Sequence, residues 1–267
     1  GLMISSMAFA ANVLQEPIYA EAAEKAADYI MQTHWREKTL LHTSKNGDAH
    51  TNGFLCDYAY LANGLIDLYE ANRNPETLKQ AISITDSMVK RFWDKEEGAF
   101  FFTEEGQTDV IARSKLSYDT SVPSGNSIAI LVLCRLGEMT GNIKYREKAE
   151  KAIQVFADQL EKRPSAFSQM LCAIDFLTAP PKTAVAAAKN KEGIQPFQEA
   201  LFDSFLPNKT VLYLDTQSSQ TLLSISRVVE GKEASNGQTT VYVCEGMACK
   251  QPVHTIDEMM AQMEATD

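Results

Sequence analysis

The feature that most constrains this chain is a threefold alternation of paired helices with short and long connections. Three segments share one pattern: an apolar helical stretch, a breaker containing Pro, Asn or Gly, and a second helix. The apolar stretches cover residues 2–14, 54–72 and 127–139. The breakers at 16–19, 74–77 and 141–145 lead into helices that end near residues 33, 93 and 161. Such breakers end one helix and start the next, so each pair is predicted to form an antiparallel helical hairpin.

The connections between hairpins are long, over residues 35–53 and 94–123. The short turns therefore fall at one end of the helix array and the long loops at the other end, where functional sites usually lie. In the second loop, residues 98–103 and 109–113 flank the polar stretch 104–107 and predict a β-hairpin. A seventh helix is expected at about residues 165–177.

After Pro180 and Pro181 the pattern changes to alternating strands and helices. Strands are expected at 183–189, 210–214 and 238–244, and helices at 195–205 and 255–264. This order predicts a small α/β unit with a mostly parallel sheet. We therefore expect a mainly α chain with two domains: helical hairpins over residues 1–180, and a small α/β subdomain over residues 181–267.

The charge of the chain excludes some classes of partner. Its 267 residues carry a net charge of −10, which argues against nucleic acid and anionic membranes because both attract clustered Lys and Arg. No apolar run approaches the roughly 20 residues of a membrane helix. Residues 2–11 end in small residues as a signal peptide does, but they lack a basic flank and have helical spacing, which favours a core helix.

The five cysteines are odd in number, and three lie in apolar helical patterns. Buried, reduced thiols in a cytoplasmic protein are the interpretation we favour. Cys244 and Cys249 have the spacing C-x4-C, which is neither the C-x-x-C redox spacing nor a complete zinc site. They are expected to be structural thiols, and the sequence predicts no metal and no cofactor.

A polar segment at residues 117–127 precedes the third apolar helix. It contains six hydroxyl residues, Asp119, Pro123, Gly125 and Asn126, a composition that cannot build a core. It is predicted to be a loop that ends at a helix N-terminus. Ser124 is most simply the helix cap, with Ser127 at the third helical position.

Five motifs in order resemble one family: residues 54–60, 92–94, 98–103, 119–127 and 242–252. It is the family of large thioredoxin-domain-containing proteins that includes the spermatogenesis-associated mammalian member. The resemblance covers nearly the whole chain and implies a toroid similar to the N-acylglucosamine 2-epimerases and six-hairpin glycosidases. It also implies that this chain is the C-terminal portion, a partial (α/α)6 toroid, without the thioredoxin-like domain and the first hairpins. Redox activity would belong to that absent domain.

Half a ring would leave apolar helix faces uncovered, which globular proteins avoid. A pairing surface is therefore expected, either for a second copy in a homo-oligomer or for the N-terminal region. The resemblance also implies a carbohydrate as the ligand.

Asp57 and Asp119 are the candidate catalytic carboxylates. Asp57 lies in the first turn of the helix that begins near Phe54, and Asp119 precedes the helix that begins near Gly125. Together they are a candidate acid–base pair of the glycosidase type. Alternatively, Asp57 complements the helix dipole and Asp119 braces its loop through backbone amides.

Several other side chains are candidate ligand contacts, each with a structural alternative. Aromatic rings can stack on a sugar but also form core stripes, and basic side chains can bind an anion but also form ion pairs with Asp119 or Asp109. The ring candidates are Tyr58, Trp93 and Tyr118, the basic ones Arg113 and Lys115, and the polar ones Ser124 and Asn126.

Two functions remain open. The first is a carbohydrate-binding enzyme, although epimerase chemistry needs bases of near-neutral pKa and the loop histidines His42 and His50 are expected to be solvated. The second is a non-catalytic module that docks with a thioredoxin-like domain. The fold alone does not decide between them.

Overall fold

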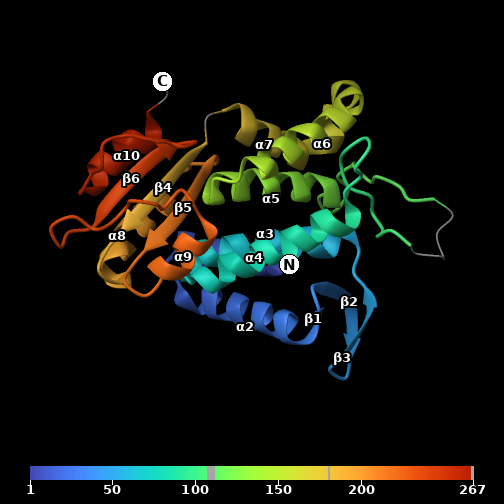
Figure 1. Ribbon diagram of the computed structural model, residues 1–267, viewed down its shortest axis with the longest axis horizontal. Helices are drawn as coiled ribbons and strands as arrows, with labels where there is room; N and C mark the ends of the chain where they lie inside the picture. Colours follow the sequence, from blue (N-terminus) through green and yellow to red (C-terminus); the bar gives the residue numbers. More distant parts are fainter. Residues whose placement is uncertain (107–111, 180, 266–267) are drawn as a thin grey trace.

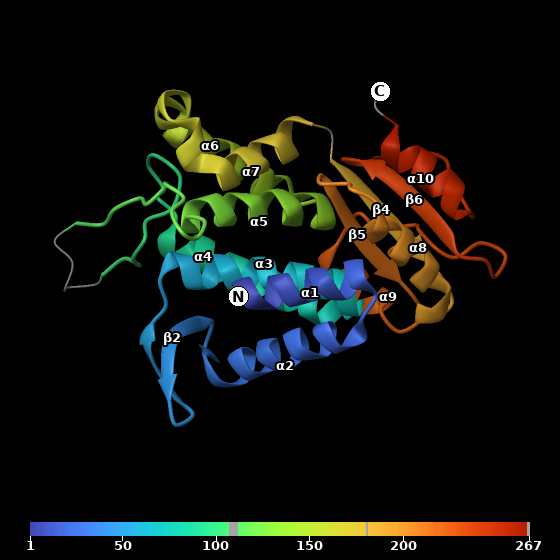
Figure 2. The same ribbon diagram turned by 180° about the vertical axis from the view of Figure 1, so that it is seen from behind.

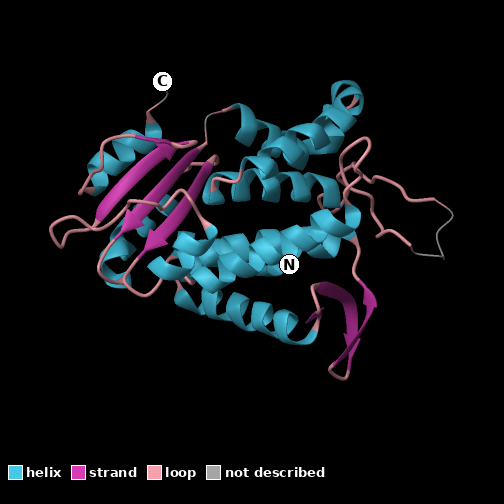
Figure 3. Cartoon of the chain, viewed as in Figure 1, coloured by secondary structure: helices cyan, strands magenta, loops and turns pink. Residues whose placement is uncertain are grey.

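The computed structural model describes residues 1–106, 112–179 and 181–265, and helices dominate it (Figures 1 and 3). The first three hairpins pair α1 (Leu2–Leu14) with α2 (Pro17–Thr33), α3 (Leu55–Asn72) with α4 (Pro75–Phe92), and α5 (Gly125–Thr140) with α6 (Ile143–Lys162). A 3-10 turn, η1 (Pro164–Phe167), leads into α7 (Ser168–Thr178). The expectation of a mainly α chain with a small α/β part is confirmed.

In each of the three hairpins, the first helix has a larger share of buried residues than the second. The central helix α3 packs against α1, α4 and α5, and α5 also packs against α6 and α7.

Pro75 occupies the first turn of α4, and Asn74 and Asn142 cap α4 and α6 by accepting hydrogen bonds from the backbone amides of Glu76 and Lys144. The breakers therefore act as expected, because each one fixes a helix start.

The C-terminal part is a four-stranded sheet in the order β5-β4-β6-β7. Its strands are β4 (Lys182–Ala187), β5 (Lys209–Leu214), β6 (Thr240–Glu245) and β7 (Ala248–Cys249). The accompanying helices are α8 (Lys191–Asp203), α9 (Ser219–Ile225) and α10 (Ile256–Glu264). All six residues of β4 are buried, and α5 contacts β5, so one continuous hydrophobic core includes side chains from the hairpins and from the sheet. The division into two domains at residue 180 stays a prediction.

The prediction of a mostly parallel sheet is wrong. Only β4 and β5 run parallel, whereas β6 pairs antiparallel with both β4 and β7. The reason is the connection: α8 links β4 to the parallel β5, but the long segment between α9 and β6 returns the chain to the opposite edge of β4 in the reverse direction.

Two predictions for the long connections also need correction. Residues 35–53, expected as a long loop, form a three-stranded antiparallel sheet of β1 (Trp35–Arg36), β2 (Thr39–Lys45) and β3 (Asp48–Asn52). Residues 98–103 form no strand and make only an isolated bridge between Trp93 and Phe100. Residues 107–111, which include most of the expected second arm, lie outside the described residues.

The cysteines also depart from the prediction. Cys244 and Cys249 form a disulfide, because the β6–β7 pairing places them opposite each other with Cα atoms 3.9 Å apart. Cys134 is buried as expected, whereas Cys56 is half-buried and Cys172 is exposed. No helix among the described residues is long and apolar enough to span a bilayer.

Candidate functional site

The two long connections meet at one end of the helix array, beyond the first turns of α3 and α5 (Figure 1). The backbone amide of Leu55 donates to the carbonyl of Phe102 across 3.0 Å, and the rings of Phe54 and Phe102 stack with centroids 5.0 Å apart. Asn52 and Arg91 both hydrogen-bond Glu104. Segments far apart in sequence are therefore fastened together here, and we call this region the loop cluster.

Asp57 joins the helix start to the β2–β3 sheet. Its Oδ2 accepts a hydrogen bond from the backbone amide of Phe54 and lies 2.8 Å from Nδ1 of His42. The ring of Phe54 lies edge-on to the imidazole, 5.1 Å away. The side chains of His42 and Asp57 are 44% and 25% exposed, so the pair is accessible to a ligand. Asp57 thus caps α3, as the structural alternative holds, and also orients a histidine.

Both carboxylate oxygens of Asp119 accept hydrogen bonds from neighbouring residues of the chain. Its Oδ1 accepts from the backbone amide of Ser124 at 2.8 Å and from the hydroxyl of Ser127 at 2.9 Å. Its Oδ2 accepts from the backbone amide of Gln169 at 2.8 Å. Three donors from the start of α5 and from α7 therefore hold the carboxylate, which is the bracing role. The hydroxyl of Tyr60 donates to the carbonyl of Pro123 at 2.5 Å, and burial, with the charges of Asp119 and Asp57, raises the pKa of this phenol.

Ser124 and Asn126 build the start of α5. The hydroxyl of Ser124 accepts a hydrogen bond from the backbone amide of Ser127 at 3.0 Å, so the interpretation of Ser124 as the helix cap is confirmed. Asn126 is fully buried: its Nδ2 donates to the carbonyls of Phe100 and Leu116, and its Oδ1 accepts from the amide of Phe100. The amide does not face a cavity, because the second long connection folds over it.

The two basic candidates bind the protein itself. Arg113 donates to the carbonyls of Thr103 and Arg91, and its guanidinium lies 4.0 Å from the centre of the Phe101 ring. Lys115 forms ion pairs with Asp94 at 2.7 Å and Glu97 at 2.8 Å. Burial alone would lower the pKa of Lys115, but its bonds to these two carboxylates raise it. Ion pairs with Asp119 or Asp109 were expected for both side chains; Arg113 instead donates to carbonyls, Lys115 pairs with other carboxylates, Asp119 is held elsewhere, and Asp109 lies outside the described residues.

The aromatic candidates divide between core and surface. Tyr58 is 1% exposed and its hydroxyl accepts from the amide of Leu40 at 2.8 Å, so it belongs to the core. Trp93 is half-buried against Phe100 and carries the ammonium of Lys148 4.6 Å from its ring centre. Tyr118 is 48% exposed and packs beside Phe167 with ring centroids 5.0 Å apart, which leaves a ring surface for a ligand.

His42 was expected to be solvated, and its side chain is indeed 44% exposed; what sequence reasoning missed is its contact with Asp57. A signal for it exists: Asn46-Gly47 lies between the β-branched and apolar residues of β2 and β3, the pattern of a two-residue hairpin turn. Both turn residues have positive φ, 53° and 82°. A hairpin predicted at this turn determines which side chains of residues 39–45 share one face of the strand, and so on which face His42 lies.

In the loop cluster, the contact between His42 and Asp57 suits proton transfer to or from a ligand. A histidine that contacts a carboxylate through one ring nitrogen presents the other nitrogen to a substrate. Cys56 is no nucleophile here, because burial and the charge of Asp57 raise the pKa of its thiol to about 11. Among the described residues, no group of three or more His, Cys, Asp or Glu side chains has the arrangement of a metal site.

The fold and the loop cluster define a class: paired helices joined at one end by long connections, followed by a small α/β part. No protein-family model matches the chain. It is similar to spermatogenesis-associated protein 20 of Rattus norvegicus and of Homo sapiens, with 27% and 28% identity over 265 residues, 95% of this chain and 34% of each relative. It is 27% identical to uncharacterized protein B0495.5 of Caenorhabditis elegans over 268 residues, 97% of this chain and 36% of that protein. The chain thus spans about a third of the length of these relatives.

Proposed function

We propose that this chain carries the acid–base site of a carbohydrate-transforming protein, with His42 as the proton-transfer group and Asp57 as its positioning carboxylate. One observation supports this above the others: Nδ1 of His42 lies 2.8 Å from Oδ2 of Asp57 while 44% of the imidazole side chain remains exposed. The carboxylate favours the tautomer whose Nε2 accepts a proton. The half toroid and the cytoplasmic location belong to the same proposal.

The proposal assigns the two candidate carboxylates different roles. Asp57 retains one oxygen that no described donor contacts, whereas both oxygens of Asp119 are held by Ser124, Ser127 and Gln169. Asp119 therefore supports the site by fixing the start of α5. The ring of Phe54 beside the imidazole, with the ring of Phe102 stacked on it, supplies the apolar surface on which the C–H face of a sugar packs.

The test is proton exchange at carbon. In the open-chain form of an aldose, a base removes the proton on C2 to give an enediolate, or an enolate when C2 carries an acetamido group, and a solvent deuteron then returns to C2. We expect the protein in D2O to remove the C2–H signal of one of glucose, mannose or N-acetylglucosamine in ¹H NMR. His42→Gln is expected to slow exchange about 100-fold or more, and Asp57→Asn to slow it less.

His50→Gln is the matched control, because His50 lies on the neighbouring strand β3 and, among the described residues, its ring hydrogen-bonds Thr51 and no carboxylate. Exchange should be unchanged in this variant. Absence of exchange with all three sugars, or an equal loss in His50→Gln and His42→Gln, would overturn the proposal.

A second function, docking, is favoured by the outer face of α1 and the start of α2. Large apolar side chains are exposed there: Leu2, Met3, Phe9, Val13, Leu14 and Ile18, with Met3 and Ile18 both 66% exposed. Figure 2 shows α1 in front of α3 with no described element covering it. In this function the face packs against a second copy of the chain or against an N-terminal region of the kind that the family resemblance implies; the chain spans 34% of the length of two longer relatives. Exposed apolar clusters of this kind mark interaction surfaces.

Light scattering tests the docking function directly. We expect the chain alone to have the mass of a dimer, and Phe9→Glu to convert it to a monomer, since the new charge would be buried without a partner. Phe205→Glu is the control, because Phe205 is 91% exposed but lies outside this face. A monomeric wild-type chain would exclude self-association through α1.

A further inference from the structure

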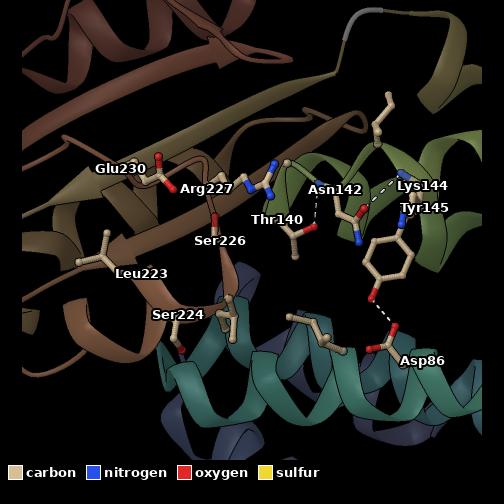
Figure 4. A pocket seen from close by; sticks show the side chains of 14 residues that line it. Asp86, Thr140, Asn142, Lys144, Tyr145, Leu223, Ser224, Ser226, Arg227 and Glu230 are labelled. Carbon is tan, nitrogen blue, oxygen red and sulfur yellow. Dashed lines mark hydrogen bonds between the residues drawn. The ribbon is translucent and has the colours of Figure 1, made fainter.

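A cavity of about 660 Å³ lies at the end of the helix array opposite the loop cluster (Figure 4). It is lined by α4, by the turn between α5 and α6, and by residues 223–227 and 230 at and after the end of α9. A cavity of this size is typical of small-molecule sites. None of the candidate residues discussed above contributes to it.

Hydrogen bonds fix the walls of this cavity. The hydroxyl of Ser226 donates to the carbonyl of Met139 at 2.6 Å, and the amide of Arg227 donates to the carbonyl of Thr140 at 3.0 Å. On the other side, the hydroxyl of Tyr145 donates to Asp86 at 2.7 Å and joins α6 to α4. Three segments distant in sequence are therefore held in place around the cavity.

Two cationic side chains of the lining have no carboxylate partner among the described residues: Lys144 and Arg227. Nearby Arg146, by contrast, pairs with Glu138 and Glu150. Figure 4 shows the Arg227 side chain extending toward Thr140, the last residue of α5, and Asn142, the cap of α6. The first turn of this 20-residue helix contains Lys144 and no acidic residue, an unfavourable arrangement at the positive end of a helix dipole. An anion bound between Arg227 and Lys144 would relieve it.

The remaining lining limits the kind of anion. Asp86 and Glu230 also face the cavity, so a ligand that is anionic along its whole length would be repelled. Carboxylates accept hydrogen bonds from hydroxyl groups. We propose that this cavity binds a small phosphate monoester of a hydroxyl-rich molecule, with the phosphate held by Arg227 and Lys144 and the hydroxyls near Asp86. The inference does not depend on the chemistry proposed for His42.

Isothermal titration calorimetry at about 50 mM salt tests the proposal, with inorganic phosphate, glucose 6-phosphate and glucose as separate probes. We expect glucose 6-phosphate to bind more tightly than inorganic phosphate, and glucose alone not to bind. Arg227→Gln and Lys144→Gln are each expected to weaken binding about tenfold or more, the usual effect of losing a charge-assisted hydrogen bond. Asp86→Asn should weaken binding of glucose 6-phosphate but not of inorganic phosphate.

Lys162→Gln is the matched control, since Lys162 is exposed at the other end of the same helix. Its affinity for glucose 6-phosphate should equal that of the wild type, and thermal melting should show all variants folded. Arg227→Lys should recover part of the affinity. Equal weakening by Lys162→Gln, full affinity in Arg227→Gln, or no saturable binding of either phosphate probe would overturn the proposal. Equal affinity for both phosphate probes would reduce the site to one for free phosphate.

Discussion

Helices α1 and α5 are the first members of their hairpins and are both rich in apolar residues, yet their surroundings differ. In α5, 13 of 16 residues are buried, whereas in α1 only Ile4, Ala8 and Asn12 of 13 are. A helix that is apolar on all sides normally lies inside a protein. α5 has α3, α6, α7 and β5 around it, but α1 has α3 and α2, with α8 touching one end. The difference indicates that α1 is at an edge of the helix array.

The largest expected effect lies in the charged network that joins α5 to α3. Arg135 bonds Asp67 at 2.6 Å and Glu70 at 3.0 Å, and all three side chains are largely buried. Arg135→Met is expected to lower the free energy of unfolding by about 3–5 kcal/mol, because two carboxylates lose their partner. Urea unfolding measures this, and a loss below about 1 kcal/mol would contradict the enclosed position of α5.

The same variant should respond to pH. Burial raises the pKa of Glu70, and the charge of Arg135 opposes that rise. Without Arg135, the folded state binds the Glu70 proton more strongly than the unfolded state does. The loss of stability is therefore complete above the folded pKa and shrinks as pH falls toward the unfolded value. Urea unfolding at pH 7 and pH 5 should show a smaller difference from the wild type at pH 5.

A somewhat smaller effect is expected inside α5 itself. Leu133 is completely buried, so Leu133→Ala should cost about 2–5 kcal/mol by leaving a cavity. Leu14→Ala in α1, where the side chain is 58% exposed, should change stability by less than about 0.5 kcal/mol. Denaturant unfolding of both variants gives the comparison, and similar losses would mean that α1 is as enclosed as α5.

The first residues of α5 and α1 also differ in how they are held. α5 is capped by Ser124 and braced by Asp119, whereas among the described residues no side chain caps α1. Asp119→Asn keeps the shape but replaces one acceptor oxygen by an amide donor, so one of the three bonds to Asp119 is lost. The expected cost is about 1–3 kcal/mol by thermal or urea unfolding. Asp57→Asn, with a single backbone donor on the carboxylate, should cost less.

Local sequence signals predicted most of the fold, and long-range contacts account for what they missed. Breakers such as Pro75 and Asn142 fix helix starts within a few residues, so the hairpins could be read directly. The direction of β6 depends on where a long connection returns, which periodicity does not record. For Asp119, a catalytic carboxylate and a brace have the same sequence pattern, and only the donors from Ser124 and Gln169 distinguish them. The contact between His42 and Asp57 likewise exists only once the β2–β3 hairpin folds against α3.

The smallest expected effect tests the edge position of α1 most directly. Phe9 is 57% exposed and Ile4 is 2% exposed on the same helix. Phe9→Ser should leave the unfolding free energy of the monomer within about 0.5 kcal/mol of the wild type, because no buried contact is lost. Ile4→Ser should cost about 2–4 kcal/mol, from lost packing and a buried hydroxyl. Unfolding at decreasing protein concentration separates the chain's own stability from association. If the cost of Phe9→Ser approaches that of Ile4→Ser only at high protein concentration, another chain covers the outer face of α1. Association between chains would then bury α1, as neighbouring elements of the same chain bury α5.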